Sequence, residues 1–219
     1  MDHILPQRCP LCREQARYGF CVKCQLLLPW IEASCPQCGT EMPKNMLCGA
    51  CQKKAPRFGA TTIPFHYAEP VDRMIQNLKY NGQLYLSGAL GKMIAISVIR
   101  RKPDLPDMLL PVPLHRSRLR KRGYNQSLEI AREISRQLSI PVNYKLAERT
   151  RSTVTQTGLT APERRRNVRG AFSVSGTIPR QHFAIVDDVV TSGSTANELA
   201  RTLMLAGAER VSIFAVSRA

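Results

Sequence analysis

The residues with the clearest chemistry lie near the C-terminal end of the sequence, where an apolar run leads to two adjacent carboxylates. Residues 183–186 are Phe-Ala-Ile-Val, and a loop rich in hydroxyls and glycine follows the acids before a helical pattern begins at Thr195. Backbone N–H groups and the dipole of a helix N-terminus favour phosphate, and paired acids can hold sugar hydroxyls or the water shell of a metal. The stretch predicts a clamp for ribose 5-phosphate, made of Asp187, Asp188, Val189, Val190, Thr191, Ser192, Gly193, Ser194 and Thr195.

This order of strand, paired acids, loop and helix resembles the signature of type I phosphoribosyltransferases, which bind phosphoribosyl pyrophosphate (PRPP). In that family the acids contact the ribose hydroxyls and the loop cradles the 5-phosphate. The resemblance implies that residues 187–195 bind PRPP and that Asp187 and Asp188 are the catalytic acids. A strand–turn–helix without a ligand is the competing interpretation, but such a unit would rarely place two acids after four apolar residues.

All eight cysteines lie between Cys9 and Cys51, in four Cys-x-x-Cys pairs. Two thiolates on a tight knuckle bind one ion, and two knuckles complete a tetrahedral site with no open position for water. The spacing therefore predicts two structural zinc ions in residues 1–54. We expect sequential grouping, with interleaved grouping as the alternative: one ion on Cys9, Cys12, Cys21 and Cys24, the other on Cys35, Cys38, Cys48 and Cys51.

The role of this cysteine-rich segment has two interpretations. Its basic residues can bind nucleic acid, or the segment can dock on the rest of the chain or on a partner. Its aromatic residues Tyr18, Phe20 and Trp30 can stack on bases, but a small apolar core is the commoner use of such residues. Residues 55–219 are expected to form the second domain.

The composition indicates a polyanionic partner. The formal net charge of the 219 residues is +16, and two filled Cys₄ sites would lower it to about +12. No apolar run approaches the ~20 residues of a membrane span, and the first residues show no signal peptide. We therefore expect a cytoplasmic protein, where thiols stay reduced and dense cysteines bind metal.

Between residue 60 and the C-terminus, strand and helix patterns alternate. The strands are expected at 61–67 (an edge strand, because of Pro64), 108–110, 142–146, 171–174, 182–187 and 211–216, and the helices at 71–78, 84–99, 127–138 and 195–206. This alternation predicts an α/β fold with a mostly parallel sheet, whose ligand would lie at the carboxyl ends of the strands.

Two basic segments precede the acid motif in the sequence. Five cations fall within residues 116–122, after a buried strand, and guanidinium groups bind phosphate oxygens well. We expect them to contact pyrophosphate or DNA rather than to form a solvated charge run. The polar loop 150–169 is either a lid over an anionic ligand or a segment without function. The predicted pyrophosphate or DNA contacts are Lys79, Arg116, Arg120, Arg122 and Asn125.

Taken in order, four pieces resemble the ComF/GntX family across essentially the whole chain. They are the paired Cys-x-x-Cys knuckles, Leu78-Lys79-Tyr80, the segment from Val112 to Ser127 with its Arg-Gly-Tyr-Asn-Gln-Ser ending, and the stretch 186–195. A fifth piece, 155–172, lies between the last two. The Arg-Gly-Tyr-Asn-Gln-Ser ending is the most family-specific part.

The resemblance implies a double zinc ribbon joined to a phosphoribosyltransferase-type domain that binds PRPP with Mg²⁺. It implies a role in DNA uptake or utilization, as in natural transformation (competence), with single-stranded DNA as ligand. It further implies partners in the DNA-uptake machinery, through which the protein would associate with the membrane.

Whether the domain turns over as a phosphoribosyltransferase is left open by the sequence, and three functions compete. The first is a PRPP-binding DNA-uptake factor, and the second is a non-catalytic nucleic-acid-binding module on the same fold. The third is an active enzyme of nucleotide salvage with no DNA role. Thr191 argues against salvage, because 6-oxopurine transferases usually carry an acid at this position of the loop.

Overall fold

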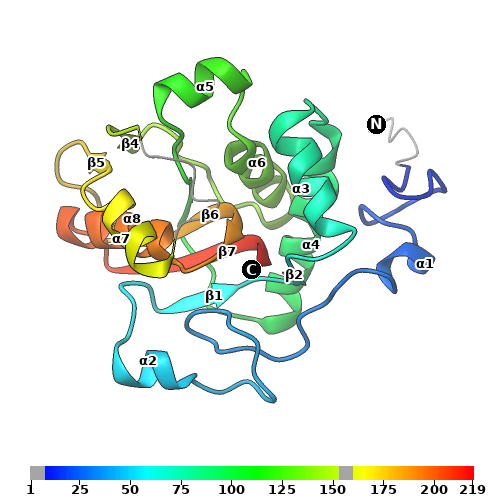
Figure 1. Cartoon of the computed structure of the whole chain (residues 1–219), viewed down its shortest axis with the longest axis horizontal. Helices are drawn as coiled ribbons and strands as arrows, with labels where there is room; N and C mark the ends of the chain where they lie inside the picture. The colour runs from blue at the N-terminus through cyan, green and yellow to red at the C-terminus, as the bar shows by residue number, and fades with distance from the viewer. Residues whose placement is uncertain (1–7, 153–159) are drawn as a thin grey trace.

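A parallel β-sheet forms the centre of the computed structural model, which describes residues 8–152 and 160–219 (Figure 1). All of its strand pairs are parallel, which confirms the predicted fold class. The strands run in the order β1 (Ala60–Thr62), β7 (Arg210–Arg218), β6 (His182–Val190), β3 (Met108–Pro111), and β2 (Phe65–His66) also pairs with β7.

Helices cover both faces of this sheet. On one face lie α3 (Val71–Tyr80), α4 (Tyr85–Arg101) and α6 (Gln126–Leu138), and on the other lies α8 (Ser194–Ala206) (Figure 1). All four agree with the predicted helices. Within the described residues, no helix combines the length and the apolar character needed to cross a bilayer.

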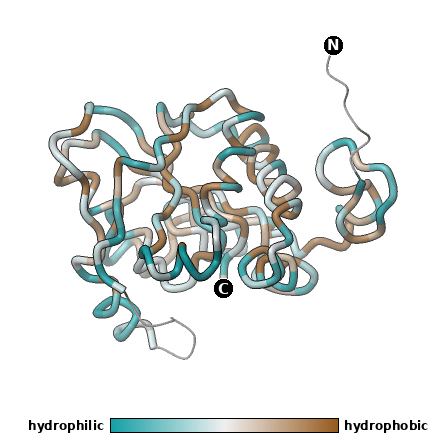
Figure 2. The backbone as a smooth tube through the Cα atoms, turned by 90° about the horizontal axis from the view of Figure 1, so that it is seen from above, coloured by the Kyte–Doolittle hydropathy of each residue, from teal (hydrophilic) through white to brown (hydrophobic). Residues whose placement is uncertain are grey.

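Two hydrophobic cores result, one on each face of the sheet. Ala184 and Val186 of β6 pack into the core beneath α3, α4 and α6, whereas Phe183 and Ile185 pack beneath α8. Successive residues of a strand point to opposite faces, so a strand buried on both sides is apolar throughout. The hydrophobic colour of Figure 2 gathers accordingly along the central strands and the helix faces beside them.

The predicted edge strand is present but interrupted. Ala60–Thr62 and Phe65–His66 both pair with β7, and Ile63 and Pro64 separate them. Proline has no N–H to donate to a neighbouring strand, so it is tolerated at this sheet edge and breaks the ladder there.

The predicted strand 142–146 is wrong. Only Val142 touches the sheet, through an isolated bridge to Leu109, and the strand that follows is β4 (Ala147–Arg149). It pairs antiparallel with β5 (Phe172–Val174) in a separate two-stranded sheet. The strand expected at 171–174 therefore exists, but it lies outside the parallel sheet.

The basic segments contain helices that the sequence patterns did not indicate. The polar loop predicted at 150–169 contains α7 (Ala161–Val168), which begins with a capping box between Thr160 and Glu163. Residues 153–159 of that loop lie outside the described residues. The segment 116–122 forms α5 (Arg116–Arg122), which buries none of its residues and stands at the top of Figure 1.

The two ribbons are docked on the α/β body, as one of the two interpretations of this segment predicted. The first, with α1 (Val22–Gln25), packs Phe20 and Leu28 into the core under α4. Trp30 stacks against Phe65 at a ring distance of 4.7 Å. The second ribbon, with α2 (Gly49–Lys53), hydrogen-bonds to β1. Phe20 and Trp30 therefore serve packing rather than base stacking.

The contact of the first ribbon with α4 depends on Gly19, which has a φ of +85° and whose added Cβ would lie 3.1 Å from the backbone of Ala89. We expect Gly19→Ala to cost about 1–3 kcal/mol more than Gly82→Ala. Gly82 also has a positive φ (+67°) but open space around it, so it controls for backbone strain alone. Denaturant unfolding of the zinc-loaded variants measures the difference, and equal losses would show that the ribbon is not held against α4 in solution.

Candidate functional site

The paired acids lie near the carboxyl end of β6, where parallel sheets bind ligands. Asp188 is only 4% exposed, and the Nζ of Lys79 lies 2.7 Å from its Oδ1. The Oδ1 of Asp187 accepts a hydrogen bond of 3.2 Å from the hydroxyl of Ser127. Each acid is thus supported from a different helix, Asp188 from α3 and Asp187 from α6.

Burial and mutual repulsion shift the pKa values in this cluster. Burial and the negative charge of Asp188 raise the pKa of Asp187. Lys79 and the hydrogen bonds offset only part of that rise, so the pKa is about 7. Burial lowers the pKa of Lys79, but the carboxylates of Asp188 and Asp187 outweigh burial and the net shift is upward. Lys79 therefore stays protonated and pairs with Asp188, whereas the pKa of Asp187 remains well above its ordinary value.

One atom of the pair has no partner within the described structure. The Oδ2 of Asp188 is buried and accepts no hydrogen bond from any described residue. A buried carboxylate oxygen without a donor is costly, and such atoms in native proteins usually mark a missing ligand or ion. Two adjacent carboxylates fit the sugar hydroxyls of a ribose, and they equally fit Mg²⁺, which prefers oxygen ligands.

A small hollow lies beside the acids, at the start of α8. Seven of the nine residues predicted to bind PRPP line it, and Asp188 and Ser192 are the two that do not. Gly193 has a φ of +71° at the N-cap and no side chain that could cap the helix. The N-terminus of α8 is therefore open to an anion. The lining residues are Asp187, Val189, Val190, Thr191, Gly193, Ser194, Thr195 and Ala196.

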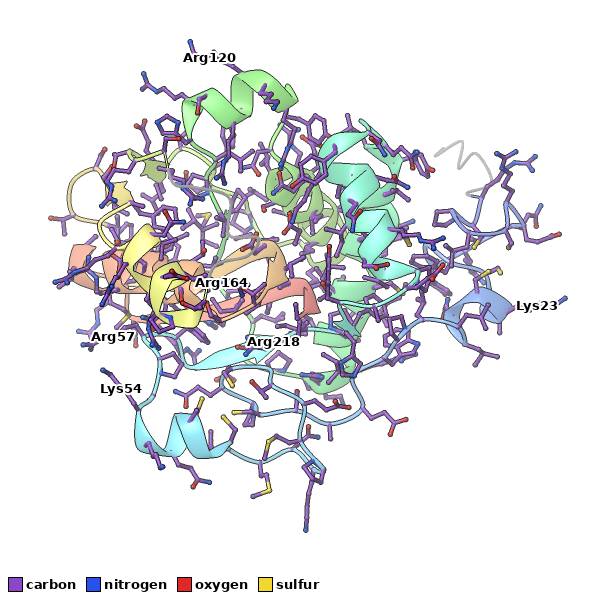
Figure 3. All side chains as sticks on the ribbon, in the orientation of Figure 1. Lys23, Lys54, Arg57, Arg120, Arg164 and Arg218 are labelled. Carbon is purple, nitrogen blue, oxygen red and sulfur yellow. The ribbon has the colours of Figure 1, made fainter. Side chains whose placement is uncertain are left out.

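The predicted contacts in the basic segment divide into two groups. Arg116 and Arg120 are exposed on α5, and Arg120 points away from the body of the molecule in Figure 3. Arg116 has a described carboxylate, that of Glu148, at 3.9 Å. These two side chains can reach a ligand in solution, but the structure does not bring them to the acids.

Arg122 and Asn125 instead hold the turn between α5 and α6. The guanidinium of Arg122 donates to Gln126 and lies 5.4 Å from the ring centroid of Tyr80. The Asn125 amide donates to the carbonyl of Val112 at 3.0 Å and accepts from the N–H of Ser127 at 3.0 Å. Asn125 thereby positions Ser127, the partner of Asp187.

Two residues near the acids, Ser127 and Arg149, were missed by the sequence interpretation. Ser127 binds Asp187 directly. Arg149 ends β4, and burial lowers its pKa to about 10, with the nearby charge of Arg118 acting in the same direction and that of Asp187 opposing. Arg149 thus places positive charge near Asp187, and Arg118 lies near Arg149. Arg149 follows Glu148 in a strand of three residues, which is too short to show a pattern in the sequence.

The eight cysteines form two compact clusters with the predicted sequential grouping. Within each cluster the four Sγ atoms lie within 4.8 Å of one another, so each can hold one tetrahedral ion. Burial raises the pKa of Cys35, but backbone N–H groups of Cys48, Cys38 and Gln37 outweigh it and bring that pKa to about 6. The knuckle backbone thus favours thiolate, the form that binds zinc.

Comparison with known proteins agrees with these features. A family described as double zinc ribbon domain matches residues 1–52, and one described as phosphoribosyl transferase domain matches residues 125–218. Competence protein F of Haemophilus influenzae is 34% identical over 223 residues, covering 97% of each chain. The chain belongs to the ComF/GntX family.

Another relative is the DNA utilization protein YhgH of Escherichia coli O157:H7, 34% identical over 222 residues and 98% of each chain. Among solved structures, a purine phosphoribosyltransferase from Pyrococcus horikoshii aligns with 61% of this chain and 82% of its own. It has 14% identity and a TM-score of 0.37. The assignment of this ComF/GntX protein therefore rests on the sequence relatives.

The separate clusters predict two independent zinc sites. Purified protein should contain two zinc ions per chain, and Cys51→Ser should contain one, because no cysteine of the first cluster can reach the second. Elemental analysis of the purified variants measures this ratio. Cys12→Ser is the matched control and should also retain one ion; loss of both ions from either variant would contradict independence.

The raised pKa of Asp187 predicts a gain of stability on neutralisation. The folded-state pKa of about 7 exceeds the ordinary 3.8, so the folded protein holds an extra proton between these values, and that stabilisation is lost as pH rises through 7. Asp187→Asn should therefore raise the Tm at pH 8, by roughly 2–4 °C for each ~1 kcal/mol, and less at pH 5. Thermal unfolding without ligand tests this, and a lower Tm at pH 8 would contradict it.

Proposed function

We propose that this ComF/GntX protein binds PRPP with Mg²⁺ at the Asp187 hollow and single-stranded DNA elsewhere, and acts in DNA uptake or utilization. The observation that best supports PRPP binding is the acid pair, with the unpartnered Oδ2 of Asp188, beside an open helix N-terminus. The relatives named competence protein F and DNA utilization protein YhgH support the DNA role. The formal charge of +16 suits a polyanionic ligand.

The 5-phosphate of PRPP occupies the hollow in this proposal. The N–H groups at the start of α8 and the hydroxyls of Thr191, Ser194 and Thr195 are donors of the kind a phosphate accepts. The ribose hydroxyls donate to Asp187 and Asp188, which gives the unpartnered Oδ2 of Asp188 a donor. Binding energy gathered at the phosphate then orients the anomeric carbon, remote from the phosphate.

The two carboxylates hold Mg²⁺ through its water shell or directly, and the bound ion supplies charge neutralisation for the pyrophosphate. Arg149 lies near Asp187, with Arg118 close to Arg149, and together they add positive charge to this region. If the chain transfers the ribosyl group, Asp187 and Asp188 stabilise the positive charge that develops on the sugar as pyrophosphate leaves. Lys79 holds the carboxylate of Asp188 in place through the 2.7 Å contact.

Nucleotide salvage without a DNA role is the competing function. It requires a group that accepts a proton from a free base, and Thr191 offers a hydroxyl where an acid would serve. Release of pyrophosphate from PRPP with a free nucleobase, at the same rate with or without DNA, would favour salvage over the proposal.

Replacing both acids tests the clamp. Asp187→Asn/Asp188→Asn should weaken PRPP binding at least tenfold, about 1.4 kcal/mol, because the ribose and Mg²⁺ lose both carboxylates. Calorimetric titration with PRPP and Mg²⁺ measures it. Asp104→Asn is the control, since this exposed carboxylate pairs with Arg210 away from the hollow and should leave affinity unchanged.

The zinc content and the Tm of each variant show that it is folded. An unchanged affinity in the double variant would refute the clamp, even if the protein bound DNA. Equal losses in the double variant and in Asp104→Asn would mean that overall charge, and not this site, governs PRPP binding.

A further inference from the structure

A second, much larger cavity lies on the other side of the phosphate loop. It has a volume of about 920 Å³ and is bounded by the second ribbon, the 54–58 linker, the end of α7 and the start of α8. Gly193 and Ser194 line both this cavity and the small hollow. The linker is tied to α8 by a hydrogen bond of 2.8 Å from the N–H of Arg57 to the side chain of Asn197.

The lining of this cavity is strongly basic. Its cations are Lys54, Arg57, Arg165, Arg169, Arg201 and Arg218, and its one lining carboxylate, Glu198, is paired with Arg201 at 2.8 Å. Figure 3 shows Lys54 and Arg57 near each other below α7, with Arg218 toward the centre.

Four of these cations form no close ion pair among the described residues, although Arg169 lies near enough to Glu198 to lower the pKa of that carboxyl. Lys54 and Arg57 on the linker, and Arg165 and Arg169 on the opposite wall, form no ion pair with a described carboxylate. Arg218 is different, because it donates to Thr40 at 3.0 Å and lies near the thiols of the second cluster. The tetrathiolate of a zinc-filled cluster adds two negative charges along one wall, which six cations still exceed.

The lining chemistry points to phosphates rather than to bases. Five of the six cations are arginines, whose planar guanidinium groups bind phosphate oxygens in pairs. The one aromatic lining residue, Phe58, is 4% exposed, so the described walls offer no ring on which a base could stack. The volume is near the upper end for small-molecule pockets, and it leaves room for several phosphates in a row.

We infer that this cavity holds the phosphodiester backbone of single-stranded nucleic acid, with unpaired cations on both walls contacting successive phosphates. This inference rests on the proposed function and adds to it the place where the strand binds. Because the loop 192–194 separates the cavity from the hollow, the strand and PRPP bind at the same time on two sides of one loop.

The test compares two variants that each remove one lysine and one arginine. Lys54→Ala/Arg57→Ala removes the two cations that the 54–58 linker contributes to the cavity. Arg17→Ala/Lys23→Ala is the matched control on the first ribbon, where Lys23 points away from the molecule at the opposite side of Figure 3. All four side chains are exposed, so both proteins should fold with two zinc ions.

Binding of a fluorescent oligo(dT) strand to the full-length zinc protein is followed by anisotropy over a range of salt concentrations. The cavity variant should bind at least tenfold more weakly than wild type, and its slope of log K against log[salt] should fall by about 1.4, for two lost contacts. The control should bind like wild type. Arg165→Ala/Arg169→Ala, from the opposite wall, should reproduce the loss, and saturating PRPP should not displace the strand.

Five outcomes would overturn this inference. Equal weakening of the cavity variant and the control would show diffuse attraction, and unchanged binding in both cavity variants would place the strand elsewhere. Displacement of the strand by PRPP, or equally tight competition by inorganic pyrophosphate, would make the cavity a small-anion site. A wild-type protein that binds PRPP but no oligo(dT) would remove the DNA role and leave the PRPP clamp standing.

Discussion

Two carboxylates held side by side at the end of a buried strand are the constraint on which the rest of the structure depends. Adjacent like charges repel, and burial makes the repulsion stronger because the protein interior screens charge poorly. The fold supplies one lysine, one serine hydroxyl, one backbone N–H and the nearby charge of Arg149, and it leaves the Oδ2 of Asp188 without a partner among the described residues. The pair is therefore energetically unfavourable by itself, and a ligand that brings hydroxyls or a cation relieves the repulsion. Buried acid pairs of this kind are typical of functional sites.

The zinc ribbons depend on metal for their stability, and the second ribbon also lines the basic cavity. A segment of about 50 residues cannot bury enough apolar surface to fold alone, and metal ligation supplies the missing stability. The first ribbon completes a core under α4, whereas the second leaves a cavity between itself and α8. Docking therefore converts a small folded module into one wall of a basic cavity, which neither part would form alone.

The sequence revealed most where one local pattern carries the chemistry. The acids with their loop are contiguous, and the Cys-x-x-Cys spacing determines its own geometry, so both were predictable. It failed where partners come from distant segments. Ser127 reaches Asp187 across 60 residues, and Lys79 reaches Asp188 from α3. The strand expected at 142–146 is a bridge at Val142, because a short apolar run does not show whether a sheet edge is available to it. α7 has a polar, basic sequence and no apolar stripe, so its capping box was the one signal to read.

The loop 192–194 keeps the hollow and the cavity in fixed positions only if α8 and α7 stay fixed relative to each other. Glu198 makes that connection: its carboxylate accepts from the backbone N–H of Gly170 at 2.9 Å and from Arg201 at 2.8 Å. The hydrogen bond from Arg201 lowers the pKa of Glu198, and the one from Gly170 adds to this effect, while burial opposes it. Glu198 therefore keeps these contacts at neutral pH. Two polyanions bound on opposite sides of this loop repel each other, and the six cations that line the cavity limit that cost. Any coupling between PRPP and a nucleic-acid strand must then pass through a loop of three residues anchored to a braced helix, which favours independent binding over strong cooperativity.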